Sequence, residues 1–143
     1  MPAVRKPKIL VISTRVTTAG FASGASAAAA VHSLPANAFP IRALIECESP
    51  MTFSAGTTTG ATATLGRSGS ASLYLSSGNL GAMTAGQKSV LGGQGAGAGV
   101  LDTTARDVLL TITPTGGAAD ADEISGGVFW VHQEYEIAPD RVG

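Results

Sequence analysis

The sequence predicts an all-β protein, built as a single antiparallel β-sandwich or jelly roll. Two runs, residues 41–48 and 61–65, alternate between apolar and polar side chains with the period of two that marks a half-buried strand. A third short run, residues 72–76, follows them with only turn residues between. Seven or eight such runs with loops of uneven length fit a sandwich better than an α/β design.

Composition sets the outer limits of this prediction. A chain of 143 residues and 14.2 kDa is large enough to bury one core without disulfides. Cys47 is the only cysteine, and its place on the apolar side of residues 41–48 predicts a small buried hydrophobe more than a reactive nucleophile. The net charge of −1 argues against nonspecific binding to nucleic acid, which needs clustered basic residues.

The first eight residues predict an extended arm ahead of a domain that spans residues 9–143. They hold Arg5, Lys6 and Lys8, three of the nine basic residues, together with two of the seven prolines. The apolar run at 9–12 is too short for the core of a signal peptide, which takes about 7–15 residues, so we expect no export signal.

A β-branched strand at residues 9–16 and a loop at 17–24 come next. Residues 25–34 contain an alanine run with high helix propensity, but their β surroundings lead us to expect a strand. A corner at 34–37 turns the chain into the next strand. Although residues 16–41 carry no charge, their glycine, serine, threonine and proline content is incompatible with a membrane helix, so we expect a soluble protein.

The central strand at 41–48 places four apolar side chains on one face: Ile41, Ala43, Ile45 and Cys47. The breaker-rich segment 49–60 then joins it to the strand at 61–65, as a hairpin or as a β-arch.

Residues 77–104 form a long glycine-rich excursion, which is either a contact loop lying on a partner or a flexible surface. Two strands follow, at 106–114 and 126–137. Their expected core faces are Val108, Leu110 and Ile112 in the first, and Phe129, Val131, Tyr135 and Ile137, with Gln133 as a polar exception, in the second. Trp130 is expected to point the other way.

The sequence contains no convincing catalytic or cofactor motif, and we expect no enzyme, no cofactor and no metal. The glycine run at 92–99 lacks the lysine and hydroxyl residue that end a phosphate-binding loop. His32 and His132 lie on separate predicted strands and are interpreted as surface or hydrogen-bonded core histidines. Asp120, Asp122 and Glu123 form either a calcium loop or a solvated acidic turn, and the missing EF-hand pattern favours the turn.

The order of several short motifs resembles the small β-sandwich proteins that decorate or cement the heads of tailed bacteriophages. The resemblance runs from about residue 31 to residue 137. It rests mainly on Leu-Gly-x-Ser-Gly at 65–69 and Gly-x-x-Phe-x-Val-x-x-x-Tyr at 126–135. It implies a structural virion protein at the capsid surface that binds the major capsid protein across capsomer junctions and has no catalytic residues.

We further expect a homo-oligomer, because a chain that is 44% hydrophobic and poor in charge leaves little polar surface on a monomer. The resemblance implies that this oligomer is a trimer. The basic residues Arg5, Lys6 and Lys8 are the expected capsid contacts, and neither nucleic acid nor membrane is an expected partner. The alternative is a carbohydrate-binding or host-attachment module of a phage particle. The low aromatic content, 5%, favours the structural role, since sugar sites usually present stacking rings.

Overall fold

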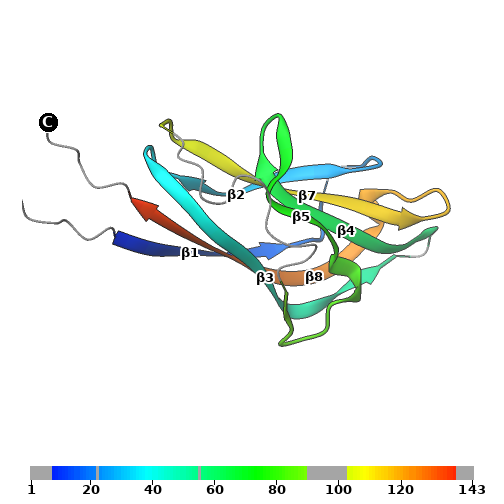
Figure 1. Cartoon of the computed structure of the whole chain (residues 1–143). Coiled ribbons are helices and arrows are strands. Elements are labelled where there is room, and N and C mark those ends of the chain that lie inside the picture. The colour runs from blue at the N-terminus through cyan, green and yellow to red at the C-terminus, as the bar shows by residue number, and fades with distance from the viewer. Residues whose placement is uncertain (1–7, 22, 55, 90–102, 138–143) are drawn as a thin grey trace, which may run out of the picture.

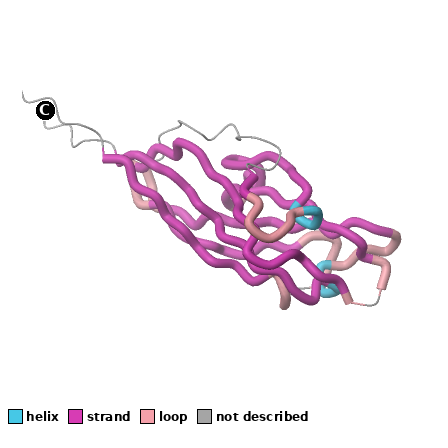
Figure 2. The backbone as a smooth tube through the Cα atoms, turned by 90° about the horizontal axis from the view of Figure 1, so that it is seen from below, coloured by secondary structure: helices cyan, strands magenta, loops and turns pink. Residues whose placement is uncertain are grey.

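The computed structural model describes residues 8–137 with the exception of residues 22, 55 and 90–102. Strands dominate these residues, and the helical content is two single 3-10 turns (Figure 2). The strands are β1 (Lys8–Thr17), β2 (Ala27–Leu34), β3 (Ala38–Phe53), β4 (Thr58–Arg67), β5 (Ser70–Asn79), β6 (Lys88–Ser89), β7 (Arg106–Gly116) and β8 (Ile124–Ile137). The 3-10 turns are η1 (Leu80–Ala82) and η2 (Ala121–Glu123), and no described helix is long and apolar enough to cross a membrane.

Two four-stranded antiparallel sheets pack face to face (Figure 1). The first sheet has the order β1-β8-β3-β6, and the second has the order β2-β7-β4-β5. Strands therefore pair from the outside of the sequence inwards, β1 with β8, β2 with β7, β3 with β6 and β4 with β5, as in a long hairpin rolled upon itself. This nested pairing is a jelly roll, which confirms the predicted fold class.

The alanine run of β2 is a strand, as its surroundings predicted. Ala27 lies opposite Ile112 of β7 and is buried at the sheet interface, so pairing with a hydrophobic neighbour outweighs helix propensity. The corner that follows contains Asn37 at φ 63°, a left-handed conformation that asparagine tolerates better than most residues.

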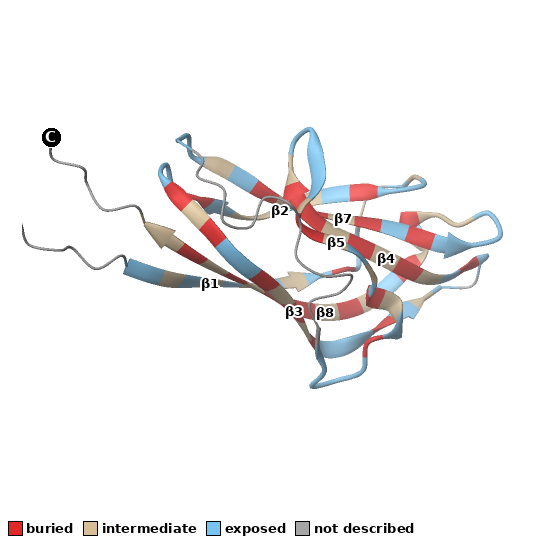
Figure 3. Ribbon diagram, viewed as in Figure 1, coloured by how far each residue is buried: buried red, intermediate tan, exposed pale blue. Residues whose placement is uncertain are grey.

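The core lies between the sheets and is built from the predicted faces (Figure 3). Ala43, Ile45 and Cys47 of β3 are buried against Phe129 and Val131 of β8, within one cluster. The equivalent face of β7, formed by Val108, Leu110 and Ile112, is buried as well. Cys47 is buried, as expected of a small hydrophobe, and burial raises the pKa of its thiol.

The prediction for Ile41 is wrong. Ile41 is exposed, because the pairing of β3 with β8 shifts between Pro40 and Arg42 and makes Ile41 the extra residue of a β-bulge. The predicted end of the strand at residue 48 is also wrong: β3 continues through Pro50 to Phe53, with further register shifts that accommodate the proline. Since β3 and β4 belong to different sheets, their connection is an arch and not a hairpin.

The first part of the excursion after β5 lies within the described residues. It contains η1, in which the Asn79 side chain accepts a hydrogen bond from the backbone amide of Ala82, and the two-residue strand β6 on the edge of β3. The remainder, 90–102, lies outside the described residues, as do Arg5 and Lys6 of the predicted arm. Lys8, the last residue assigned to that arm, is the first residue of β1 and lies opposite Ile137.

Candidate interaction face

The side of the first sheet that points away from the core carries the most varied chemistry in the described residues. We call it the outer face. It is formed by Ile9, Val11, Ser13 and Arg15 of β1, Trp130, His132, Glu134 and Glu136 of β8, Phe39, Ile41, Arg42, Leu44, Glu46 and Glu48 of β3, and Lys88 of β6. The corresponding side of the second sheet is dominated instead by uncharged threonines, such as the facing pairs Thr62–Thr113 and Thr64–Thr111.

Three large hydrophobic side chains are exposed on the outer face. Ile9 is 61% exposed, Val11 is 56% exposed and Ile41 is 36% exposed. The register places them at one end of the sheet, because Val11 and Arg42, the neighbour of Ile41, both lie opposite Glu134. Burying such a side chain against a partner releases about 1.5–3 kcal/mol, so a cluster of three favours a contact surface.

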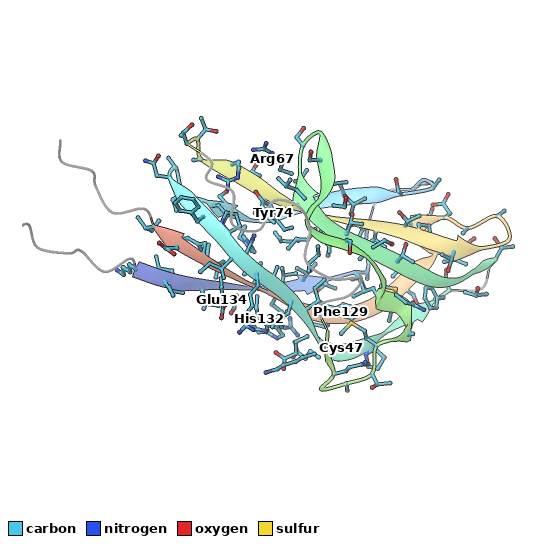
Figure 4. The ribbon with its side chains drawn as sticks, in the orientation of Figure 1. Cys47, Arg67, Tyr74, Phe129, His132 and Glu134 are labelled. Atoms are coloured by element: carbon cyan, nitrogen blue, oxygen red, sulfur yellow. The ribbon has the colours of Figure 1, made fainter. Side chains whose placement is uncertain are left out.

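A hollow of about 150 Å³ opens on the same face. Its lining comes from all four strands of the sheet and consists of Val11, Arg42, Leu44, Lys88, His132 and Glu134. Figure 4 shows His132 and Glu134 on this outer side, whereas Phe129 belongs to the core cluster. An apolar floor ringed by charged groups fits one protruding side chain of a partner.

The ion pairs of the outer face present their cations outwards. Arg42 donates two hydrogen bonds to the Glu134 carboxylate, at 2.7 and 3.1 Å, and Lys88 lies 4.0 Å from Glu46. The side chains of Arg42 and Lys88 are 57% and 62% exposed, against 28% and 29% for their carboxylate partners. A partner would therefore meet positive charge first, although the pairs are close to neutral.

Arg15 reaches across β8 to Glu48 on β3, with Nε 2.8 Å from the carboxylate. The indole Nε1 of Trp130 donates to the same carboxylate at 3.2 Å. These hydrogen bonds, led by that from Arg15, lower the pKa of Glu48 and keep it ionised. The arrangement turns the Arg15 side chain inwards over the sheet and away from the edge of β1.

His132 is the hydrogen-bonded histidine that the sequence predicted. Its Nε2 donates to Glu46 at 2.9 Å, and its Nδ1 lies 2.7 Å from the Ser13 hydroxyl. The ring stacks on Trp130, with centroids 6.4 Å apart and planes 9° apart. Both ring nitrogens are occupied, so this side chain holds the sheet surface together.

His32 is hydrogen-bonded as well, between the two sheets. Its Nε2 lies 2.7 Å from the amide oxygen of Gln133, and its Nδ1 lies 3.1 Å from the Thr14 hydroxyl. Gln133 is fully buried, and its Nε2 has no hydrogen-bond partner within the described part of the chain. Burial lowers the pKa of His32, only partly offset by the hydrogen bond to Gln133.

This lowered pKa predicts a pH dependence of stability. Above the ordinary value of 6.5, His32 is neutral in both the folded and the unfolded chain and has no effect. As the pH falls below 6.5, the unfolded chain takes up a proton that folded His32 refuses, so the free energy of unfolding decreases down to the lower folded pKa. Urea titrations between pH 7 and pH 5 measure this decrease. The His32→Asn variant should have a flatter profile, and an unchanged slope in that variant would refute the assignment.

The acidic turn at 120–123 is hydrogen-bonded to the loop before β4 and to the loop before β2. Glu123 accepts hydrogen bonds from the backbone amides of Thr57 and Thr58, at 3.1 and 2.7 Å, and Asp120 accepts one from Gly24 at 2.9 Å. The hydrogen bonds from Thr58 lower the pKa of Glu123. Asp122 is exposed and its pKa is raised, mainly by its contact with Asp120. No group of three metal-ligating side chains was found among the described residues.

The candidate site residues predicted from the sequence do not come together in one site. Lys8 is exposed at the beginning of β1, while the predicted contacts Arg5 and Lys6 lie outside the described residues. His32 and His132 are far from the acidic turn and do not form a joint site with it. Sequence reasoning missed the exposed pair Ile9 and Val11, although both lie on the same side of the predicted strand at 9–16.

Comparison with known proteins identifies the fold. No family model and no curated protein matches the chain. Among solved structures, it is similar to a chain described as "Cyanophage Pam1 capsid asymmetric unit", with a TM-score of 0.62 and 20% sequence identity. The alignment covers 96% of this chain and 93% of that chain. At this identity, the similarity shows that the two chains share a fold over nearly their whole length.

Proposed function

We propose that this protein is a structural component of a bacteriophage virion, which decorates the capsid surface and cements it by binding the major capsid protein across capsomer junctions. The observation that supports the proposal is the shared fold, over 96% of the chain, with a chain from a cyanophage capsid asymmetric unit. In this proposal the protein has no catalytic residue, and its role is to bury surface between capsid subunits.

The outer face supplies the chemistry that this role needs. The exposed hydrophobic side chains of Ile9, Val11 and Ile41 provide area to bury. The outward-pointing cations of Arg42 and Lys88 add selectivity for an acidic surface. In the proposal the protein is a homotrimer, so that three copies of each contact act together and individually weak contacts give tight retention.

The arm is the second proposed contact. Arg5, Lys6 and Lys8 precede or begin β1, and exposed ion pairs of this kind contribute about 0–1 kcal/mol each. Deleting residues 2–7 should weaken binding to undecorated shells of the major capsid protein encoded in the same genome. It should also reduce the salt dependence of binding, because fewer charges are screened.

Occupancy of purified shells across ionic strengths, together with sedimentation of the free protein, tests the whole proposal. Failure of the intact protein to bind any such shell would overturn the proposed function. If the truncated protein shows the same occupancy and salt dependence as the intact protein, the arm is not a capsid contact. If the free protein sediments as a monodisperse monomer, the proposed trimer is wrong.

The alternative, a carbohydrate-binding or host-attachment module, finds one supporting feature. Trp130 is an aromatic side chain on the outer face. However, its ring already stacks on His132 and its Nε1 already donates to Glu48. Tyr74, Phe129 and Tyr135 are buried. Phe39, opposite Glu136, is the other aromatic side chain on the outer face, and it is half-buried.

A further inference from the structure

We propose that the free edge of β1 accepts an extended segment of the major capsid protein as a fifth strand of the first sheet. This inference rests on the proposed function and names the binding mode of the same surface. Strand addition gives affinity through backbone hydrogen bonds and specificity through alternate side chains.

β1 lies at the edge of its sheet, and β8 is its one strand partner among the described residues. The two strands pair over ten consecutive residues, from Lys8–Ile137 to Thr17–Val128, without a register shift. Thr18 donates to the directly opposite Gly127 oxygen at 3.0 Å, which makes this pair hydrogen-bonded. By the alternation of an antiparallel ladder, the even-numbered residues of β1 bond to β8, whereas Ile9, Val11, Ser13 and Arg15 direct their N–H and C=O groups to the free edge.

The free edge of β1 lacks the features that usually protect an edge strand. It has no proline and no bulge, and its one charged residue in mid-strand, Arg15, is turned inwards to Glu48. The other edges are interrupted. β2 carries a bulge between Ala30 and His32, the pairing of β5 with β4 shifts twice, and β3 contains two prolines and is partly covered by β6.

Side chains define the occupant. An added strand would lie beside exposed Ile9 and Val11 on one side of the sheet and beside half-buried Leu10 and Ile12 on the other. The added strand must therefore carry apolar side chains on both of its faces where it lies beside these four residues. Lys8, the one proposed capsid contact within the described residues, is exposed at the beginning of β1, next to exposed Ile9. The surface proposed to meet the shell therefore continues into the free edge, and the occupant is a segment of the same shell protein.

The Val11→Pro variant tests the edge directly. Proline at this position removes an outward N–H but no hydrogen bond to β8, as edge strands tolerate. The matched control is Val11→Thr, which keeps the N–H and the branched shape. We expect Val11→Pro to bind shells at least about tenfold more weakly than Val11→Thr, while urea titrations confirm that both variants fold.

Residue-resolved amide hydrogen exchange of the native protein gives a second readout that needs no variant. In the free protein the amides of Leu10, Ile12 and Thr14 should be protected, and those of Ile9, Val11 and Ser13 should exchange quickly. On shells, the second set should become protected as well. Suppose that the intact protein binds shells, that these amides still exchange quickly, and that the two variants bind equally well. This result would overturn strand addition but leave the proposed function standing. Protection of the same amides in the free protein, together with a dimer in sedimentation, would instead identify a second copy as the occupant and overturn the shell segment.

Discussion

The Phe129→Ala variant should lose about 3–5 kcal/mol of its free energy of unfolding, measured by urea or guanidinium titration. Phe129 is fully buried and is the largest of the fully buried side chains. The backbone of Gly127 lies close to the edge of its ring, since a Cβ at Gly127 would lie 3.1 Å from Phe129 Cε2. That close packing leaves little room for collapse, so the truncation leaves a cavity.

Trp130→Ala is the matched control for this prediction. Trp130 is the neighbouring residue on the same strand, with its side chain on the outer face, and its truncation loses the hydrogen bond to Glu48 but creates no interior cavity. Its destabilisation should be clearly smaller. If Trp130→Ala proved the more damaging change, the facing of β8 would be inverted along its whole length.

The second large effect is expected for Gly66→Ala, which should destabilise the protein by about 2–3 kcal/mol. Gly66 lies near the end of β4, just before the turn into β5. A Cβ added there would overlap the backbone carbonyl oxygen of Ser70 and lie 2.5 Å from that of Ala71. Both obstacles are backbone atoms, so the β4–β5 hairpin itself must move.

Gly117→Ala provides the comparison. There an added Cβ would meet only the Thr57 side chain, at the ordinary contact distances of 3.6 and 3.8 Å. Thermal or urea unfolding should therefore leave Gly117→Ala near the stability of the wild type. A Gly66→Ala protein that is as stable as Gly117→Ala would show that the hairpin adjusts freely at this point.

The sequence predicted the features that depend on local alternation. Cys47, Leu110 and Phe129 are buried as expected, because a strand with one covered face must repeat every two residues. Ile41 escaped this rule because its bulge is imposed by the pairing with β8, almost a hundred residues away in the sequence. The same holds for His32 and Gln133, which are 101 residues apart and meet only when the sheets pack.

The candidate interaction face was harder to predict than the core. Alternation places Ile9 and Val11 on one side of a strand, but it does not reveal whether that strand lies in the middle or at the edge of a sheet. Strand order is set by which long-range pairs form, and no short motif encodes it. The exposed apolar pair of β1 became visible only once the order β1-β8-β3-β6 was known.

The pairing of β1 with β8 also governs how the protein can fold during its synthesis. β1 is translated before the other strands, yet the strand that covers it follows only after roughly a hundred further residues. At about 5–20 residues per second, the ribosome takes on the order of 5–20 s to cover that length. Throughout this interval β1 has two bare edges and apolar residues on both faces, the pattern that favours aggregation of nascent chains. Slower initiation, or a chaperone that holds β1 until β8 emerges, would therefore raise the yield of correctly folded protein without changing the stability of the final fold.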